Sequence, residues 1–204
     1  MAEINNKHLE ITGNSMSAIH QQPTELALWY SLVEDAKSRC DSPLATDESA
    51  YLVYLLMRYL QKPEITENCF ALSYLEAQLE TGRYKADRLQ AVGDQCLLTS
   101  GFFPQQAHRK RVRLNYFVQL GQAAYLQLAE SSIQSIACLY SGLAEQFVRM
   151  MDVLQTLKGL SAAEPLLTPL DAIDLWQQTG SDRALQALEL NTDNFLIQGI
   201  KTRQ

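Results

Sequence analysis

The chain has 204 residues, enough for one well-buried core, and 47% of them are hydrophobic, an ordinary share for a globular protein. A formal net charge of −6 at pH 7 argues against general affinity for nucleic acids, without excluding a local basic site. The longest uncharged apolar run, Ala50 to Met57, is too short to span a bilayer, and residues 1–22 lack the apolar core of a signal peptide, so we expect a cytoplasmic protein.

The N-terminal third of the chain predicts a flexible arm followed by two helices. Residues 1–22 are polar and aperiodic, which is typical of a flexible arm. A first helix opens at residues 23–24, where proline and threonine favour helix starts, and ends near residue 40. A second helix, from Thr46 to about Leu60, is apolar almost all round, so we expect it to be central.

Residues 89–129 are the most informative stretch and predict two helices joined by a tight break. A third helix, marked by leucines 72, 75 and 79, stops at Gly82 and precedes them. The fourth, residues 83–100, ends at the sequence Gly-Phe-Phe-Pro of residues 101–104. We expect Gly101 to take the left-handed conformation there and Pro104 to open the next element. A fifth helix follows over residues 112–129.

Small side chains recur on the fourth and fifth helices and let their backbones approach closely. They are Gly93, Cys96, Gly121, Ala123 and Ala124. The pattern favours tight packing between the two helices, with a dimer seam as the alternative.

The C-terminal part predicts one long amphipathic helix and two short ones. Apolar residues recur at helical spacing from Ile133 to Leu154, so we expect a single helix that ends at Lys158-Gly159. Thr168 and Ser181 are good caps for short helices to Gln178 and Leu190. The whole is an all-α, single-domain helical bundle over residues 23–190, with about six main helices, two short ones and a C-terminal tail at 191–204. Apolar residues in that tail indicate either docking on the body or pairing with another chain.

Motifs for enzyme chemistry are missing from the sequence. Ser100 or Cys96 with His108 and Asp94 is the only triad we can nominate, and nothing in the spacing brings these groups together. The metal-binding motif H-E-x-x-H, the nucleophile elbow G-x-S-x-G and phosphate-binding glycine loops are absent. Cysteines 40, 69, 96 and 138 form no C-x-x-C pair and are expected to be reduced, buried thiols. We therefore assign no catalytic residue, metal ligand or cofactor.

A basic run is the strongest polar signal, and it comprises His108, Arg109, Lys110, Arg111 and Arg113. Positive charge at a helix N-terminus is unfavourable, so the run either closes a short helix begun at Pro104 or meets an acidic partner. That partner is a carboxylate cluster of this chain, an anionic ligand or nucleic acid, and the 23 acidic residues of the chain favour the first, an internally paired face. Nucleic acid is disfavoured, because no aromatic residues are interleaved with the charges.

Four tyrosines define a rival possibility, a ligand pocket. It would be lined by Tyr51, Tyr54, Tyr116 and Tyr125 and gated by Arg109, Arg111 or Arg113. For the tyrosines of the second helix, core filling with each hydroxyl bonded is the plainer interpretation.

The stretch Leu97-Leu98-Thr99-Ser100-Gly101-Phe102-Phe103-Pro104 resembles a motif of a family of uncharacterised bacterial all-helical proteins, in which the string is closer to Leu-Phe-Leu-Ser-Gly-Phe-Phe-Pro. The resemblance implies a helical fold and a bacterial origin, and it transfers no site. Our expectation is a non-enzymatic cytoplasmic protein that acts through protein contacts, with a partner protein or as a homodimer and without membrane attachment. The alternative is a small-molecule or anion-binding protein, which includes an enzyme, with the tyrosine pocket.

Overall fold

The computed structural model describes residues 24–61, 70–109, 111–160 and 165–190. Regular structure in these ranges is helical, without a strand, so the predicted all-α class is confirmed. The helices are α1 (Glu25–Arg39), α2 (Thr46–Gln61), α3 (Phe70–Leu79), α4 (Gly82–Gly101), α5 (Pro104–Arg109), α6 (Leu114–Glu130), α7 (Gln134–Glu145), α8 (Phe147–Gly159) and α9 (Pro169–Thr179), and residues 182–190 form a further helix. Within these ranges no helix has the length and apolar character needed to cross a membrane. The predicted arm and tail, residues 1–22 and 191–204, lie outside the described residues.

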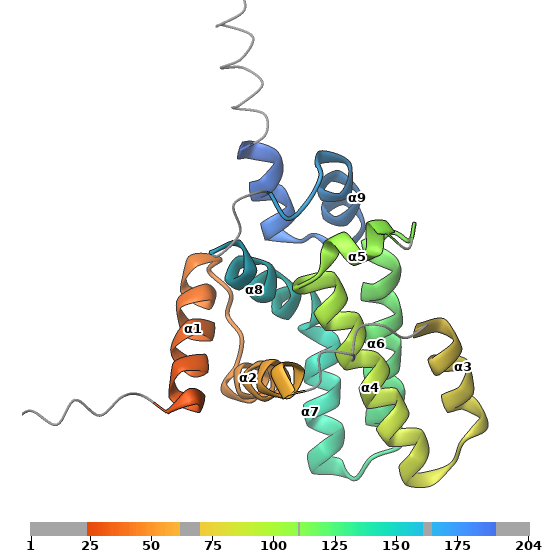
Figure 1. Ribbon diagram of the computed structural model, residues 1–204. Coiled ribbons are helices and arrows are strands. Elements are labelled where there is room, and N and C mark those ends of the chain that lie inside the picture. Colours follow the sequence, from red (N-terminus) through yellow and green to blue (C-terminus); the bar gives the residue numbers. More distant parts are fainter. Residues whose placement is uncertain (1–23, 62–69, 110, 161–164, 191–204) are drawn as a thin grey trace, which may run out of the picture.

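Helix α4 lies at the centre of the molecule and contacts α3, α5, α6 and α8 (Figure 1). Its C-terminal half is buried on almost every side, and its closest neighbour is α6. A Cβ atom added to Gly93 of α4 would overlap the ring of Tyr125 on α6, and one added to Gly121 of α6 would lie 2.9 Å from Cβ of Cys96 on α4. Tight packing of α4 and α6 through their small residues is therefore confirmed.

The predicted left-handed conformation of Gly101 is wrong. Gly101 is the last residue of α4 and does not have a positive φ, and the first residue beyond it, Phe102, is still in the right-handed helical region. Glycine is needed for space instead: a Cβ atom would lie 2.7 Å from Cβ of Leu154 and 3.2 Å from the carbonyl oxygen of Met151. Helix α8 thus passes directly over the end of α4.

The predicted long helix from Ile133 to Gly159 is two helices, α7 and α8, which meet at Gln146. The backbone of Gln146, with φ −91° and ψ 9°, turns the chain between them. Helix α7 packs on α2 and α6, whereas α8 packs on α1 and α4. Each of the two helices buries one apolar face, so the helical spacing of apolar residues continues across Gln146. This spacing therefore does not indicate that the chain changes direction there.

The burial of α3 and of α2 differs from what their sequences indicate. Leucines 72, 75 and 79 of α3 are all more than half exposed, while Phe70 and Ala77 face the core. Helix α2 buries one broad face through Leu52, Val53, Leu55 and Leu56, but Tyr54 is 59% exposed, so α2 is not covered all round.

Caps fix the helix ends where the sequence places them. The Thr24 hydroxyl accepts from the N–H of Ala27 at 3.2 Å, and that of Thr168 accepts from the N–H of Asp171 at 3.3 Å. Gly180 ends α9 in the left-handed conformation, with φ 70°. The predicted helix starts at these two threonines are confirmed.

A buried carboxylate attaches the helix at 182–190 to the body of the protein. Asp152 of α8 is 4% exposed and accepts hydrogen bonds from the Ser181 hydroxyl at 2.6 Å and from the backbone N–H groups of Asp182 and Arg183 at 3.1 and 3.4 Å. Ser181 itself accepts from the N–H of Ala184 at 3.0 Å, as its predicted capping role requires. The start of this helix is therefore capped by its own serine and by α8.

Candidate functional site

A buried carboxylate on α4 gathers the hydroxyl groups of two of the predicted pocket tyrosines. Asp94 is 1% exposed, and its Oδ1 accepts hydrogen bonds from Tyr51 of α2 at 2.5 Å and from Tyr125 of α6 at 2.8 Å. Its Oδ2 lies 3.3 Å from Nη1 of Arg58, whose side chain is half exposed. The ring of Tyr140, from α7, lies about 6 Å from the rings of both tyrosines.

Burial sets the protonation behaviour of this cluster. It raises the pKa of Asp94, while the hydrogen bonds from Tyr51 and Tyr125 and the charge of Arg58 oppose that shift. Burial, together with the negative charge of Asp94, also raises the pKa of both tyrosines, so their hydroxyls stay protonated and donate. The bonds from the Tyr51 and Tyr125 hydroxyls to Asp94 hold α2, α4 and α6 in one arrangement and engage both hydroxyls as donors.

The space beside this cluster is small. Tyr51, Tyr54, Leu55, Arg58, Gln90 and Asp94 line a cavity of about 70 Å³. A water molecule takes about 30 Å³ in the liquid, and pockets for organic ligands measure about 300–1,000 Å³. The cavity therefore has room for about two water molecules.

The structure separates the other members of the predicted tyrosine pocket. Tyr116 lies on α6, 39% exposed and edge-on to its neighbour Phe117, and it does not line the cavity. None of the three proposed gating arginines lines it either, and the arginine at its wall is Arg58. Sequence reasoning missed Arg58, although it lies one helical turn after Tyr54 and two turns after Tyr51.

The nominated triad is not assembled in the described part of the chain. The Ser100 hydroxyl donates to the backbone carbonyl of Cys96 at 2.8 Å, and Asp94 is engaged by the tyrosines. Burial raises the pKa of the Cys96 thiol, which disfavours the nucleophilic thiolate. The side chain of His108 lies outside the described residues.

Metal-ligating side chains and cysteine thiols are the remaining groups that could carry chemistry. Among the described residues, no group of three or more histidines, cysteines and carboxylates could hold a metal ion. Cys40 and Cys96 are free and buried, as predicted, whereas Cys138 is free and exposed on α7, so the prediction of a buried thiol is wrong there. Cys69 lies outside the described residues.

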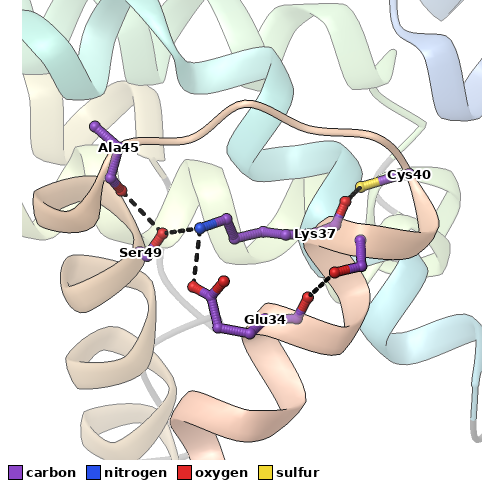
Figure 2. A network of polar contacts seen from close by, with 6 residues as sticks. Glu34, Lys37, Cys40, Ala45 and Ser49 are labelled. Atoms are coloured by element: carbon purple, nitrogen blue, oxygen red, sulfur yellow. Dashed lines mark hydrogen bonds and ion pairs between the residues drawn. The ribbon is translucent and has the colours of Figure 1, made fainter.

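A polar network joins α1 to α2 (Figure 2). Nζ of Lys37 lies 2.8 Å from a carboxylate oxygen of Glu34 and 2.8 Å from the Ser49 hydroxyl, which in turn donates to the carbonyl of Ala45 at 2.9 Å. Glu34 and Lys37 also line an open cleft of about 190 Å³ that continues to Pro43. Because the lysine already has an acid and a hydroxyl as partners, the network ties the two helices together and offers no unpaired charge to a ligand.

Of the predicted basic run, His108 and Arg109 end α5, Arg111 and Arg113 lie between α5 and α6, and Lys110 lies outside the described residues. Helix α5 begins at Pro104 and ends at Arg109, so the run closes a short helix, which is the favourable alternative for positive charge. The N–H of Val112 bonds to the carbonyl of Ala107 at 3.0 Å, and Arg111 between them has φ 54°. This is the Schellman arrangement, in which the left-handed position is usually glycine. We call the exposed side chains of Arg109, Arg111 and Arg113 the basic turn.

An apolar surface lies on the neighbouring helix. Helix α9 buries Ala172 and Leu175 but leaves Leu170, Ile173 and Trp176 between 40% and 76% exposed, and we call these three the α9 face. Helix α9 packs on α6, close to α5 (Figure 1), and Nη1 of Arg113 lies 3.1 Å from Oδ1 of Asp174. The ion pair therefore places Arg113, the last residue of the basic turn, beside helix α9, which carries the α9 face.

Two features of this surface escaped the sequence analysis. Helical spacing identified α9 but not which apolar residues would face water, and the left-handed backbone of Arg111 has no signal in a sequence where glycine is the usual marker. His108 and Lys110 belong to the predicted run, but their side chains lie outside the described part of the chain.

The comparisons with known proteins do not add a family to these observations. No protein-family model matches the chain, and the searches of curated proteins and of solved structures give no significant match. The resemblance of residues 97–104 to a bacterial family thus stays an expectation.

Proposed function

We propose that the chain is a non-enzymatic protein-binding module whose basic turn and α9 face together bind an acidic, amphipathic segment of a partner protein. The observation that carries the proposal is the position of the basic turn beside three exposed apolar side chains, joined by the ion pair of Arg113 and Asp174. Arginine and tryptophan are enriched among the residues that dominate binding energy at protein interfaces.

Charge supports an acidic partner. Arg109 and Arg111 have no carboxylate within ion-pair distance among the described residues, although the chain carries 23 acidic residues and a net charge of −6. Carboxylates of a partner would complete these two guanidinium groups, and charge-assisted bonds to arginine are among the stronger polar contacts. The apolar side of the same segment would cover Leu170, Ile173 and Trp176.

The backbone of Arg111 is a second support. A left-handed conformation costs a non-glycine residue about 1–2 kcal/mol relative to the right-handed one. Glycine adopts this backbone conformation at lower free energy. The turn itself therefore does not require an arginine at position 111. A role for its exposed guanidinium in recognition accounts for that cost.

The free thiols support a cytoplasmic location. The described cysteines, Cys40, Cys96 and Cys138, form no disulfide. Cysteines stay reduced in the cytosol, so free thiols fit a cytoplasmic protein. The proposed partner would then be a cytoplasmic protein as well.

Site-specific photo-crosslinking tests the proposal. A photoreactive amino acid replaces Gln177, which is exposed on the same side of α9 as Leu170 and Ile173, and the crosslinked peptide is sequenced after capture in cells. We expect one acidic segment with helical apolar spacing. As a synthetic peptide it should bind the purified protein about tenfold or more weakly after combined Arg109→Glu and Arg111→Glu substitution.

The matched control is Leu75→Ser, which removes an exposed leucine from α3 (61% exposed, against 40% for Ile173), on another part of the surface. This variant should bind the peptide like the wild type, whereas Ile173→Ser should bind more weakly. A crosslinked segment that is basic, a crosslink to nucleic acid or to a second copy of this chain, or equal loss of binding in Leu75→Ser would overturn the proposal.

A further inference from the structure

A second pocket lies between α8, the chain at residues 165–167 and the helix at residues 182–190. Its volume is about 260 Å³, larger than the cavity of about 150 Å³ that holds benzene in an engineered protein. Leu166, Leu167, Ala187 and Leu190 supply apolar walls, and Gln155 and Arg183 are its polar members. It shares no residue with the basic turn or the α9 face.

The amide of Gln155 is only half bonded. Gln155 is fully buried, and its Nε2 donates to the backbone carbonyl of Ser100 at 3.0 Å. Its Oε1 is buried and has no hydrogen-bond partner. Exchanging the two amide atoms would set an oxygen against the carbonyl of Ser100, so the acceptor remains unpaired in either placement. Gln155 is one of the residues that line the pocket, and its unpaired acceptor is a group that the donor of a bound molecule can satisfy.

Arg183 is the second polar member of the same pocket and provides a positive charge. Its backbone N–H is held by Asp152 at 3.4 Å, and its Nη2 would be 3.3 Å from a Cβ atom added to Gly159. No carboxylate lies within ion-pair distance of the guanidinium in the described ranges, and its bond to Oε1 of Gln186 is long, at 3.5 Å. The guanidinium can therefore accept an anionic group.

From this set we propose that the pocket binds a small aliphatic acid that also carries a hydrogen-bond donor on its chain. The carboxylate pairs with Arg183, the aliphatic chain lies along the leucines, and the donor, a hydroxyl or an amide N–H, bonds to Oε1 of Gln155. The volume of the pocket, about 260 Å³, is too small for large lipids. A plain hydrocarbon chain would leave Oε1 of Gln155 unpaired, so the pocket should bind it less tightly than a chain with a donor.

Isothermal titration calorimetry on the full chain tests each contact with three probes: 3-hydroxyoctanoate, octanoate and 1-octanol, all below the concentrations at which they form micelles. We expect saturable one-to-one binding of 3-hydroxyoctanoate, weaker binding of octanoate and the weakest binding of 1-octanol. Arg183→Met should weaken 3-hydroxyoctanoate about tenfold or more, as the loss of a charge-assisted bond requires. Arg149→Met is the control, because Arg149 lies on α8 with a similar bond to Gln146 but faces solvent.

A variant of Gln155 gives the sharper test. In Gln155→Leu the preference for 3-hydroxyoctanoate over octanoate should disappear, because leucine has no oxygen to accept a hydrogen bond from the ligand hydroxyl. If this variant does not fold, Ala187→Phe, which fills the pocket, should abolish binding of both acids. No saturable binding of either acid, equal binding in Arg183→Met, or unchanged binding in Ala187→Phe would overturn the proposal and leave a pocket that holds only water.

Discussion

Substitution of Gly101 tests the central contact of the fold, the crossing of α8 over the end of α4. An alanine Cβ would lie 2.7 Å from Cβ of Leu154, whereas carbon atoms pack best at about 3.5–4.0 Å, so the two helices must separate by about 1 Å. Overpacking of this kind costs about 1–3 kcal/mol. The better helix propensity of alanine returns at most about 1 kcal/mol. We expect Gly101→Ala to lose about 1–2 kcal/mol of unfolding free energy, which for a chain of this length lowers Tm by about 2–8 °C.

The order of two substitutions separates lack of space from backbone strain. Asparagine tolerates the left-handed conformation better than alanine but is larger. At Gly101, which is not left-handed, Gly101→Asn should therefore be less stable than Gly101→Ala in urea and thermal unfolding. At Gly180, which has φ 70° and open space around its Cα, the order should be reversed. Gly101→Asn more stable than Gly101→Ala would refute the reasoning, because it would mean that strain and not contact with Leu154 requires glycine.

Three other outcomes are expected. Tyr125→Phe removes a hydroxyl that donates to the buried carboxylate of Asp94 and should lower the unfolding free energy in urea by about 1–3 kcal/mol; an unchanged value would show that the other donors suffice. Leu75→Ser should change the unfolding free energy by no more than about 0.5 kcal/mol. Leu89→Ala, at a fully buried site, should lower the unfolding free energy by about 2–5 kcal/mol. Equal losses in the two variants would contradict the exposed position of Leu75. Burial raises the pKa of Asp152 to about 6 from its ordinary 3.8, so the folded state binds this proton more tightly than the unfolded state, and the contribution of Asp152 to stability should fall by about 3 kcal/mol as pH rises from about 4 through 6. The non-titrating variant Asp152→Asn should show a flatter stability profile over that range, and a carboxyl resonance of Asp152 that titrates near 3.8 would contradict the assignment.

Local signals in the sequence predicted the helix ends well because they act within a few residues. Thr24, Thr168 and Gly180 each do what a cap residue does in isolation. For the run from His108 to Arg113 the sequence leaves two alternatives open, and the structure has the one in which a short helix begun at Pro104 ends at Arg109, where the dipole favours positive charge.

Directions in space were harder to predict. The apolar period runs unbroken through Gln146, yet the chain turns there, because periodicity reports that a face is covered and not by which helix. For the same reason the leucines of α3 marked a helix correctly but gave no sign that they face solvent. Gly101 shows a related limit: a glycine at a helix end suggests a left-handed residue, and only the path of α8 reveals that the space is occupied.

The candidate sites were only partly accessible from the sequence. Tyr51 and Tyr125 are two of the four tyrosines of the predicted pocket, and the structure brings these two, 74 positions apart in the chain, to one atom of Asp94. That aspartate had been considered only for a triad, and Arg58 not at all, since a carboxylate and an arginine on different helices carry no mutual spacing signal. The α9 face and the pocket at Gln155 depend on which side of a helix remains uncovered, and that is decided by tertiary packing.

The attachment of the last helix through Asp152 bears on where this protein can be shortened. A chain ended at Gly180 would lose the serine hydroxyl and the two N–H groups that solvate the Asp152 carboxylate, while the rest of the fold would keep that acid away from water. Trimming what looks like a peripheral appendage would thus leave an unsolvated charge inside the remaining protein. Any shortened version intended to fold should therefore extend at least to Leu190.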